Sequence, residues 1–144
     1  MPANTDPIFS KEGEIANNGT TGMNALVTLA ANDYTGAGAN NSLIFTADAT
    51  NGSFIQRIRF KAGGTNVASV ARIFINNGAV NTTAANNVFY GEISLPATTA
   101  IATAATVEID YPMNFAIPAG FCLYFGLGTA VAAGWVATVI GGNY

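Results

Sequence analysis

Residues 54–61 read Phe-Ile-Gln-Arg-Ile-Arg-Phe-Lys, and this stretch decides the fold class. In an extended strand, successive side chains point to opposite faces of the sheet. The alternation predicts that Phe54, Ile58 and Phe60 share one face. The opposite face then carries the three basic residues of the stretch, Arg57, Arg59 and Lys61. An apolar face behind a charged face predicts a β-strand that covers a core on one side and meets solvent on the other.

The rest of the chain repeats this design in short apolar runs. In 106–111, Val107, Ile109 and Tyr111 alternate with two acidic residues, Glu108 and Asp110. Turn-forming stretches such as Asn-Asn-Gly at 76–78 and Ile-Pro-Ala-Gly at 117–120 separate the runs. The predicted strands cover residues 23–30, 42–47, 54–62, 67–76, 87–95, 106–117, 121–128 and 135–141.

Many short strands with regular turn signals predict an all-β protein. We expect a single antiparallel β-sandwich, jelly-roll-like with about eight strands. A seven-stranded immunoglobulin-like sandwich is the alternative. Residues 1–22 are polar and without periodicity, which predicts an extended N-terminal arm that becomes ordered where it docks. The β-sandwich domain is expected to span residues 23–144.

The composition argues against catalysis. The 144 residues include no His, one Cys, five basic and eight acidic side chains, so few groups can be tuned for acid–base or nucleophilic chemistry. We therefore expect no enzyme, no cofactor and no metal site. The net charge of −3 without a basic cluster predicts no nucleic-acid partner. Charged residues make up 9% of the chain, well below the usual ~25%, which suggests a surface partly covered by partner subunits.

The single cysteine and the apolar runs also limit the possibilities. Cys122 cannot form an intrachain disulfide, and its apolar surroundings predict a buried, inert thiol. The polar N-terminus predicts no secretory signal, so we expect synthesis in a cytoplasm. The apolar runs are shorter than the ~20 residues that a spanning helix needs, which predicts no membrane segment.

The charged strand faces are the candidate functional residues. The functional interpretation is a protein-contact patch, whereas the alternative is a solvated face in which neighbouring strands pair their charges. The aromatic residues Tyr34, Phe89, Tyr90, Trp135 and Tyr144 could stack on sugars, although a core or subunit-interface role is favoured. The candidate protein-contact residues are Arg57, Arg59, Lys61, Glu108 and Asp110.

Four stretches carry a resemblance to a known family. They are Phe-Ile-Gln-Arg-Ile-Arg-Phe-Lys-Ala-Gly-Gly-Thr at 54–65, Val-Ala-Arg-Ile-Phe-Ile-Asn-Asn at 70–77, Phe-Ala-Ile-Pro-Ala-Gly-Phe-Cys-Leu at 115–123, and the ending Trp-Val-Ala-Thr-Val-Ile-Gly-Gly-Asn-Tyr at 135–144. From residue 54 onward the chain resembles the decoration, or cement, proteins of tailed-phage heads. Position 143 is Asn where the similar terminus of that family carries Asp.

This resemblance implies a β-sandwich subunit, often a homotrimer, on the capsid exterior of a bacteriophage virion. Its partner would be the major capsid protein, and no catalytic residue is implied. The N-terminal arm would wrap a neighbouring subunit, since about 20 extended residues reach up to ~65 Å. The alternative function is a carbohydrate- or receptor-binding module of a phage tail fibre, spike or head fibre. Fibres tend to be repetitive, and this chain has no internal repeat.

Overall fold

The fold of this computed structural model is described for residues 12–17 and 26–144, and the statements below concern these residues. They contain eight β-strands and one short 3₁₀-helix, so no helix there is long and apolar enough to cross a membrane. The elements are β1 (Glu12–Asn17), β2 (Ser42–Thr46), β3 (Ser53–Ala62), β4 (Ser69–Asn76), η1 (Ala84–Asn86), β5 (Asn87–Leu95), β6 (Glu108–Ile117), β7 (Cys122–Leu127) and β8 (Trp135–Asn143).

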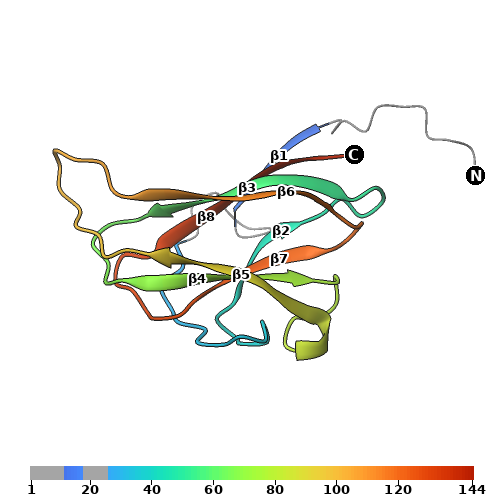
Figure 1. The fold of residues 1–144 in the computed structure, drawn as a ribbon, viewed down its shortest axis with the longest axis horizontal. Helices are drawn as coiled ribbons and strands as arrows, with labels where there is room; N and C mark the ends of the chain where they lie inside the picture. The colour runs from blue at the N-terminus through green and yellow to red at the C-terminus, as the bar shows by residue number, and fades with distance from the viewer. Residues whose placement is uncertain (1–11, 18–25) are drawn as a thin grey trace, which may run out of the picture.

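The strands form two antiparallel four-stranded sheets that face each other (Figure 1). We name the sheet in the order β1-β8-β3-β6 sheet A, and the sheet in the order β2-β7-β4-β5 sheet B. The first strand pairs with the last, the second with the seventh, the third with the sixth and the fourth with the fifth. This pairing is that of a long hairpin wrapped into a sandwich, so the predicted jelly-roll-like fold is confirmed.

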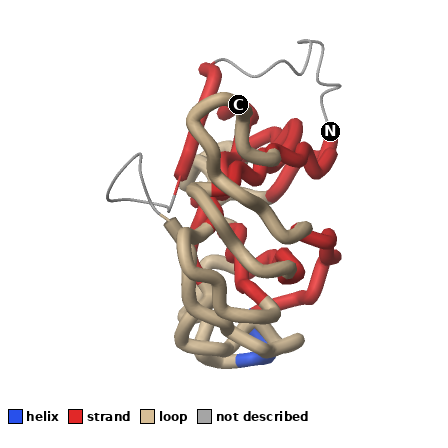
Figure 2. Tube along the Cα trace, turned by 90° about the vertical axis from the view of Figure 1, so that its left-hand side faces the viewer, coloured by secondary structure: helices blue, strands red, loops and turns tan. Residues whose placement is uncertain are grey.

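The core lies between the inner faces of the two sheets. Phe60 of β3 meets Phe125 of β7 across the sandwich, with ring centroids 5.2 Å apart. Trp135 at the start of β8 is fully buried, so its predicted core role is confirmed and it is no exposed sugar platform. Cys122 is also buried, as predicted. Figure 2 turns the molecule by 90° and shows the loops that connect the strands at one end of the sandwich.

Strand β3 departs from simple alternation. Ile55, Ile58 and Phe60 are fully buried, whereas Phe54 is only partly buried. The register of β3 against β8 shifts between Ile55 and Arg57, so that Gln56 is an extra residue with no partner. Such a β-bulge turns two successive side chains outward and reverses the phase of the strand. The prediction that Phe54 shares the core face with Ile58 is therefore wrong, because the bulge places Ile55 there instead.

The N-terminal part of the chain also differs from the prediction. Of the predicted strand 23–30, residues 23–25 lie outside the described ranges, and 26–30 make only two isolated bridges, Val27 with Trp135 and Ala30 with Leu127. Within the predicted arm 1–22, Glu12–Asn17 forms β1 and pairs with β8 at the edge of sheet A. Residues 1–11 and 18–22 of that predicted arm lie outside the described residues. The eighth strand is thus β1 rather than the run at 23–30.

The bulge in β3 can be tested by two alanine substitutions. Ile55→Ala should lower the free energy of unfolding by about 2–5 kcal/mol, because it leaves a cavity in the core. Phe54→Ala should cost clearly less, although it removes a larger side chain, since Phe54 is only partly buried. Urea denaturation measures both values. A larger loss for Phe54→Ala would contradict the bulge and restore the uninterrupted alternation.

Candidate protein-contact surface

The five candidate contact residues come together on the outer face of sheet A. Arg59 of β3 lies directly opposite Asp110 of β6, and its Nε and Nη2 donate hydrogen bonds of 2.8 and 3.1 Å to the two carboxylate oxygens. Lys61 lies opposite Glu108, with 3.6 Å between Nζ and the nearest carboxylate oxygen. The Nε of Arg57 lies 3.7 Å from the Asp110 carboxylate. We call these five residues the charged row.

The charged row has the geometry of cross-strand pairing. The hydrogen bonds from Arg59 lower the pKa of Asp110, so this carboxylate stays ionised under ordinary conditions. Pairs this exposed contribute little to stability, and their clearer effect is to favour one register between β3 and β6. The alternative that the strands pair their own charges is what the structure shows. Contact with another protein through this row stays a prediction.

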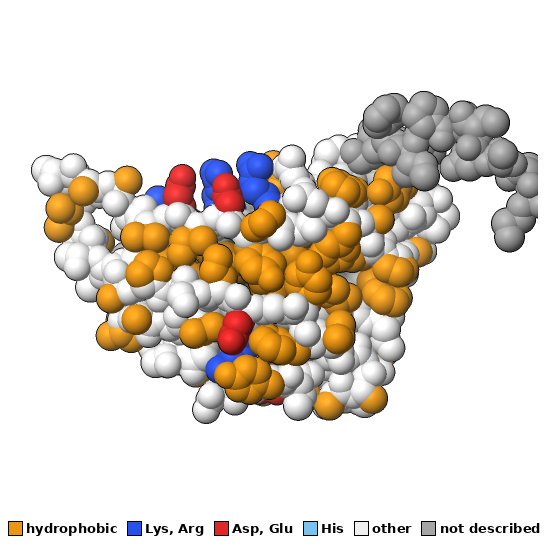
Figure 3. Space-filling view, viewed as in Figure 1, with side chains coloured by type: hydrophobic (Ala, Val, Ile, Leu, Met, Phe, Trp, Pro, Cys, Tyr) orange, Lys and Arg blue, Asp and Glu red, His pale blue; other side chains and the backbone are white. Residues whose placement is uncertain are grey.

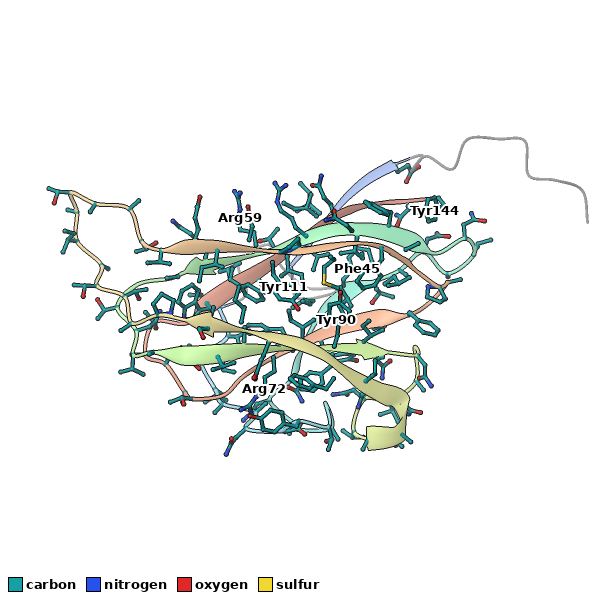
Figure 4. The ribbon with its side chains drawn as sticks, viewed as in Figure 1. Phe45, Arg59, Arg72, Tyr90, Tyr111 and Tyr144 are labelled. Atoms are coloured by element: carbon teal, nitrogen blue, oxygen red, sulfur yellow. The ribbon has the colours of Figure 1, made fainter. Side chains whose placement is uncertain are left out.

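Three aromatic residues lie where the sandwich opens between β5 and β6. Tyr90 of β5 packs against Tyr111 and Phe115 of β6, with ring centroids 6.4 and 5.2 Å away. In Figure 4, Tyr111 reaches down from sheet A and Tyr90 lies below it on sheet B. A Cβ on Gly91 would overlap the Tyr111 hydroxyl, so glycine at this position lets the ring cross between the sheets. These aromatic residues close the side of the core.

The same side of the molecule presents an apolar surface to solvent. Val88 is 57% exposed and Tyr90 40% exposed, and their apolar neighbours on both edge strands are only partly buried. In Figure 3 apolar side chains form a continuous band across this view, between charged residues above and below. We call this surface the edge band, and it consists of Val88, Tyr90, Ile93, Ile109, Tyr111 and Phe115.

Both strands under the edge band are the last in their sheets, and both are irregular. In β6, Pro112 lacks a backbone N–H, and Asn114 has a positive φ of 54° where the register against β3 shifts. In β5, the register against β4 shifts at Tyr90. Prolines and bulges of this kind prevent a further strand from pairing along an edge. A partner that binds this side of the sandwich must therefore be contacted through side chains and not through backbone hydrogen bonds along the edge strands.

A second ion pair lies on the sheet B side of the edge band. Glu92 of β5 lies 3.6 Å from the Nε of Arg72 on β4. The Arg72 guanidinium stacks 3.9 Å from the ring centroid of Tyr34 and donates a 2.9 Å hydrogen bond to the Tyr34 hydroxyl. Figure 4 shows Arg72 below sheet B, facing the loop that carries Tyr34. Sequence reasoning missed this pair, which follows from the register of β4 against β5.

The loop that brings Tyr34 to Arg72 is organised by Asp33. One carboxylate oxygen accepts hydrogen bonds of 2.6 Å from both the backbone N–H and the hydroxyl of Thr35. The other accepts 2.8 Å bonds from the Gly38 N–H and the Asn41 amide. Partial burial by itself raises the pKa of Asp33, but these hydrogen bonds outweigh it and lower the pKa from 3.8 to about 2.

A shallow pocket of about 250 Å³ lies away from the edge band. It is lined by residues 26–29 and 39–42, including Leu26, Leu29 and Asn41. Its volume is below the ~300–1,000 Å³ typical of small-molecule sites. The Asp48 carboxylate accepts hydrogen bonds from the backbone N–H groups of Thr50 and Asn51 in its own turn. Residues 12–17 and 26–144 contain no group of three or more His, Cys, Asp or Glu side chains that could hold a metal ion.

Comparisons of the chain with protein-family models, with curated proteins and with solved structures gave no match.

Protonation of Asp33 should weaken the fold at low pH. A carboxylate whose pKa is lower in the folded state stabilises the protein above its unfolded pKa of 3.8, and that contribution is lost as the pH falls towards 2. The melting temperature of the wild type should therefore drop between about pH 4 and pH 2, and by more than that of Asp33→Asn. Glu12→Gln, which changes an exposed carboxylate on β1, serves as the control and should follow the wild type. Equal pH profiles for Asp33→Asn and the wild type would contradict this role.

Proposed function

We propose that the chain is a structural protein of a bacteriophage virion, which decorates and stabilises the capsid by binding across neighbouring capsid subunits. The observation that carries the proposal is the edge band, an apolar surface on the side of a rigid sandwich with charged pairs along both margins. Contiguous apolar patches with a polar rim are typical of protein–protein contact sites. The resemblance of residues 54–144 to decoration proteins supplies the kind of partner, the major capsid protein.

The fold suits a structural protein that resists mechanical force rather than one that changes its conformation. β1 pairs with β8, β2 with β7 and β3 with β6, so parts of the chain that are distant in the sequence are held together. In a decoration role many copies bind a repeating lattice, so weak contacts at each copy add up over the particle. Assembly as a homo-oligomer, with a trimer favoured, belongs to this proposal, as does a position on the capsid exterior.

Carbohydrate or receptor binding is the second candidate, and the Tyr34 cluster is the observation that favours it. Tyr34 is 58% exposed beside the Arg72–Glu92 pair, and an open aromatic ring next to charged groups is suited to sugar contacts. One face of the Tyr34 ring is, however, taken by Arg72, and Phe89 packs edge-on at 5.5 Å. These contacts tie the loop to sheet B, so capsid binding is the better supported function.

Binding to particles distinguishes the two candidates. We expect purified chain to bind phage heads that lack it in hundreds of copies per head, as a repeating lattice offers, and to raise the temperature at which the heads release their DNA. Quantitative gel analysis of sedimented heads gives the copy number. A dozen copies or fewer, together with saturable glycan-array binding that Tyr34→Ala abolishes, would instead establish the carbohydrate-binding alternative.

The proposed clamp by the N-terminal arm has its own test. A variant lacking residues 1–11 keeps β1 and its pairing with β8. We expect it to fold with an unchanged melting temperature but to bind heads more weakly, because the arm no longer wraps a neighbouring subunit. Unchanged lattice binding and unchanged head stability would show that the arm has no part in the clamp.

A further inference from the structure

We propose that the edge band binds a protein surface on which an apolar ridge is flanked on both sides by Lys or Arg residues. This inference rests on the proposed function and extends it, because it assigns the contact to one side of the sandwich and gives the chemistry of the partner surface. The evidence for it is the distribution of charges between the edge strands, β5 and β6, and the neighbouring strands, β4 and β3.

The two edge strands carry acidic residues and no basic ones. Glu92 is on β5, and Glu108 and Asp110 are on β6, so carboxylates stand on both margins of the edge band. Their basic partners are one strand further in, with Arg72 on β4 and the other three on β3. Figure 3 shows the result, with acidic groups both above and below the apolar side chains.

The carboxylate of each pair is also the more exposed partner. The Asp110 side chain is 43% exposed against 39% for Arg59. For Glu108 and Lys61 the values are 55% and 40%. The contrast is greatest on the sheet B side, where Glu92 is 46% exposed and Arg72 only 10%. On the sheet B side an approaching protein therefore meets a negative group first, and on the sheet A side the carboxylates are on the outer strand with Arg57, Arg59 and Lys61 one strand further in.

The basic groups are committed to contacts within the chain. Lys61 Nζ donates a 2.7 Å hydrogen bond to the Thr106 carbonyl, and Arg72 is held by Tyr34. The carboxylates of Glu92 and Glu108, by contrast, accept no hydrogen bond from the described residues and lie 3.6 Å from their basic partners. Charge-assisted hydrogen bonds are shorter than this, so both carboxylates can accept donors from a partner.

A second copy of the chain fits this surface poorly in a two-fold contact. A two-fold contact places the same surface of each copy against the other, and in both copies the edge strands carry Glu92, Glu108 and Asp110 and no basic residue. Carboxylates of one copy would then lie close to carboxylates of the other beside an apolar contact that excludes water, and the second copy brings no basic residue on its own edge strands to offset this. Pairing through the main chain is also blocked by Pro112 and by the bulges in β5 and β6. Charge complementarity therefore selects a partner with basic margins.

Two matched sets of variants test the proposal on heads that lack the chain. Val88→Lys places a positive charge in the edge band, whereas Val80→Lys makes the same change at a valine that is 62% exposed in the loop between β4 and β5. The triple variant Glu92→Gln, Glu108→Gln, Asp110→Asn removes the acidic margins, and Glu12→Gln on β1 is its single-charge control. Thermal melts establish that each variant is folded.

We expect Val88→Lys and the triple variant to bind heads at least about tenfold more weakly than the wild type, and the two controls to bind normally. The loss for the triple variant should be greatest at low salt, because salt screens the charges it removes. If the wild type binds heads but Val88→Lys and the triple variant bind equally well, the inference is wrong while the proposed function stands.

Binding of a synthetic peptide in the absence of phage heads tests the further inference separately from the proposed function. The probe is a helical peptide whose Leu stripe is flanked by Arg on both sides, and the same peptide with Glu in place of Arg is its control. NMR shift changes should map to β5 and β6 with the Arg peptide and be absent with the Glu peptide. Such binding without any binding to heads would uphold the inference and reject the proposed function.

Two further results would overturn the inference. One is equal binding of the Arg and Glu peptides, or shift changes that map away from β5 and β6. The other comes from sedimentation of the chain alone. If the wild type is an oligomer that Val88→Lys dissociates and Val80→Lys does not, the edge band holds a second copy.

Discussion

Two facing sheets exclude water from the core between them only if the open sides of the sandwich are closed. On the β5–β6 side this is done by Tyr90, Tyr111 and Phe115, and by the space that Gly91 leaves for the Tyr111 hydroxyl. These rings must reach the edge to cover the core, so one side of each ring stays in contact with water. The edge band is therefore a consequence of closing the fold, and the proposed contact would use a surface that the fold already requires.

Much of this fold could be predicted from residue alternation. In strand β6 the outward Glu108 and Asp110 alternate with the inward Ile109 and Tyr111, so these faces and the end of the strand at Ile117 were predicted, whereas the strand begins at Glu108 and not at the predicted residue 106. In β3 the same rule failed at Phe54, because the extra residue Gln56 reverses which side chains of the strand face the core. A glutamine side chain gives no indication of a β-bulge. β1 was missed for another reason. Its Glu, Gly and Asn residues are poor strand formers, and it is a strand through its pairing with β8.

The contact surface was predictable only in part. The charged row follows from alternation in two strands, since opposite charges at equal spacing favour a register in which Arg59 faces Asp110. The pair of Glu92 with Arg72 also lies on neighbouring strands, but its environment depends on Tyr34, which a loop far away in the sequence brings over sheet B. The pattern of residues does not give the order of the strands in each sheet, and it is this topology that makes β5 and β6 edge strands. The edge band could not be assigned without it.

The placement of charges links stability to binding. Within the folded chain each ion pair is a weak contact, because water solvates the exposed carboxylate and reduces its attraction to the base behind it. A partner that covers the edge band removes this water, and the same pairs then act in a less polar environment. Such a partner would also cover Val88 and the exposed sides of Tyr90 and Phe115. Because such a partner binds only the folded state, its binding free energy adds to the stability of the sandwich. Closing the core on the β5–β6 side thus leaves a surface where binding of a partner and stability of the fold would be linked.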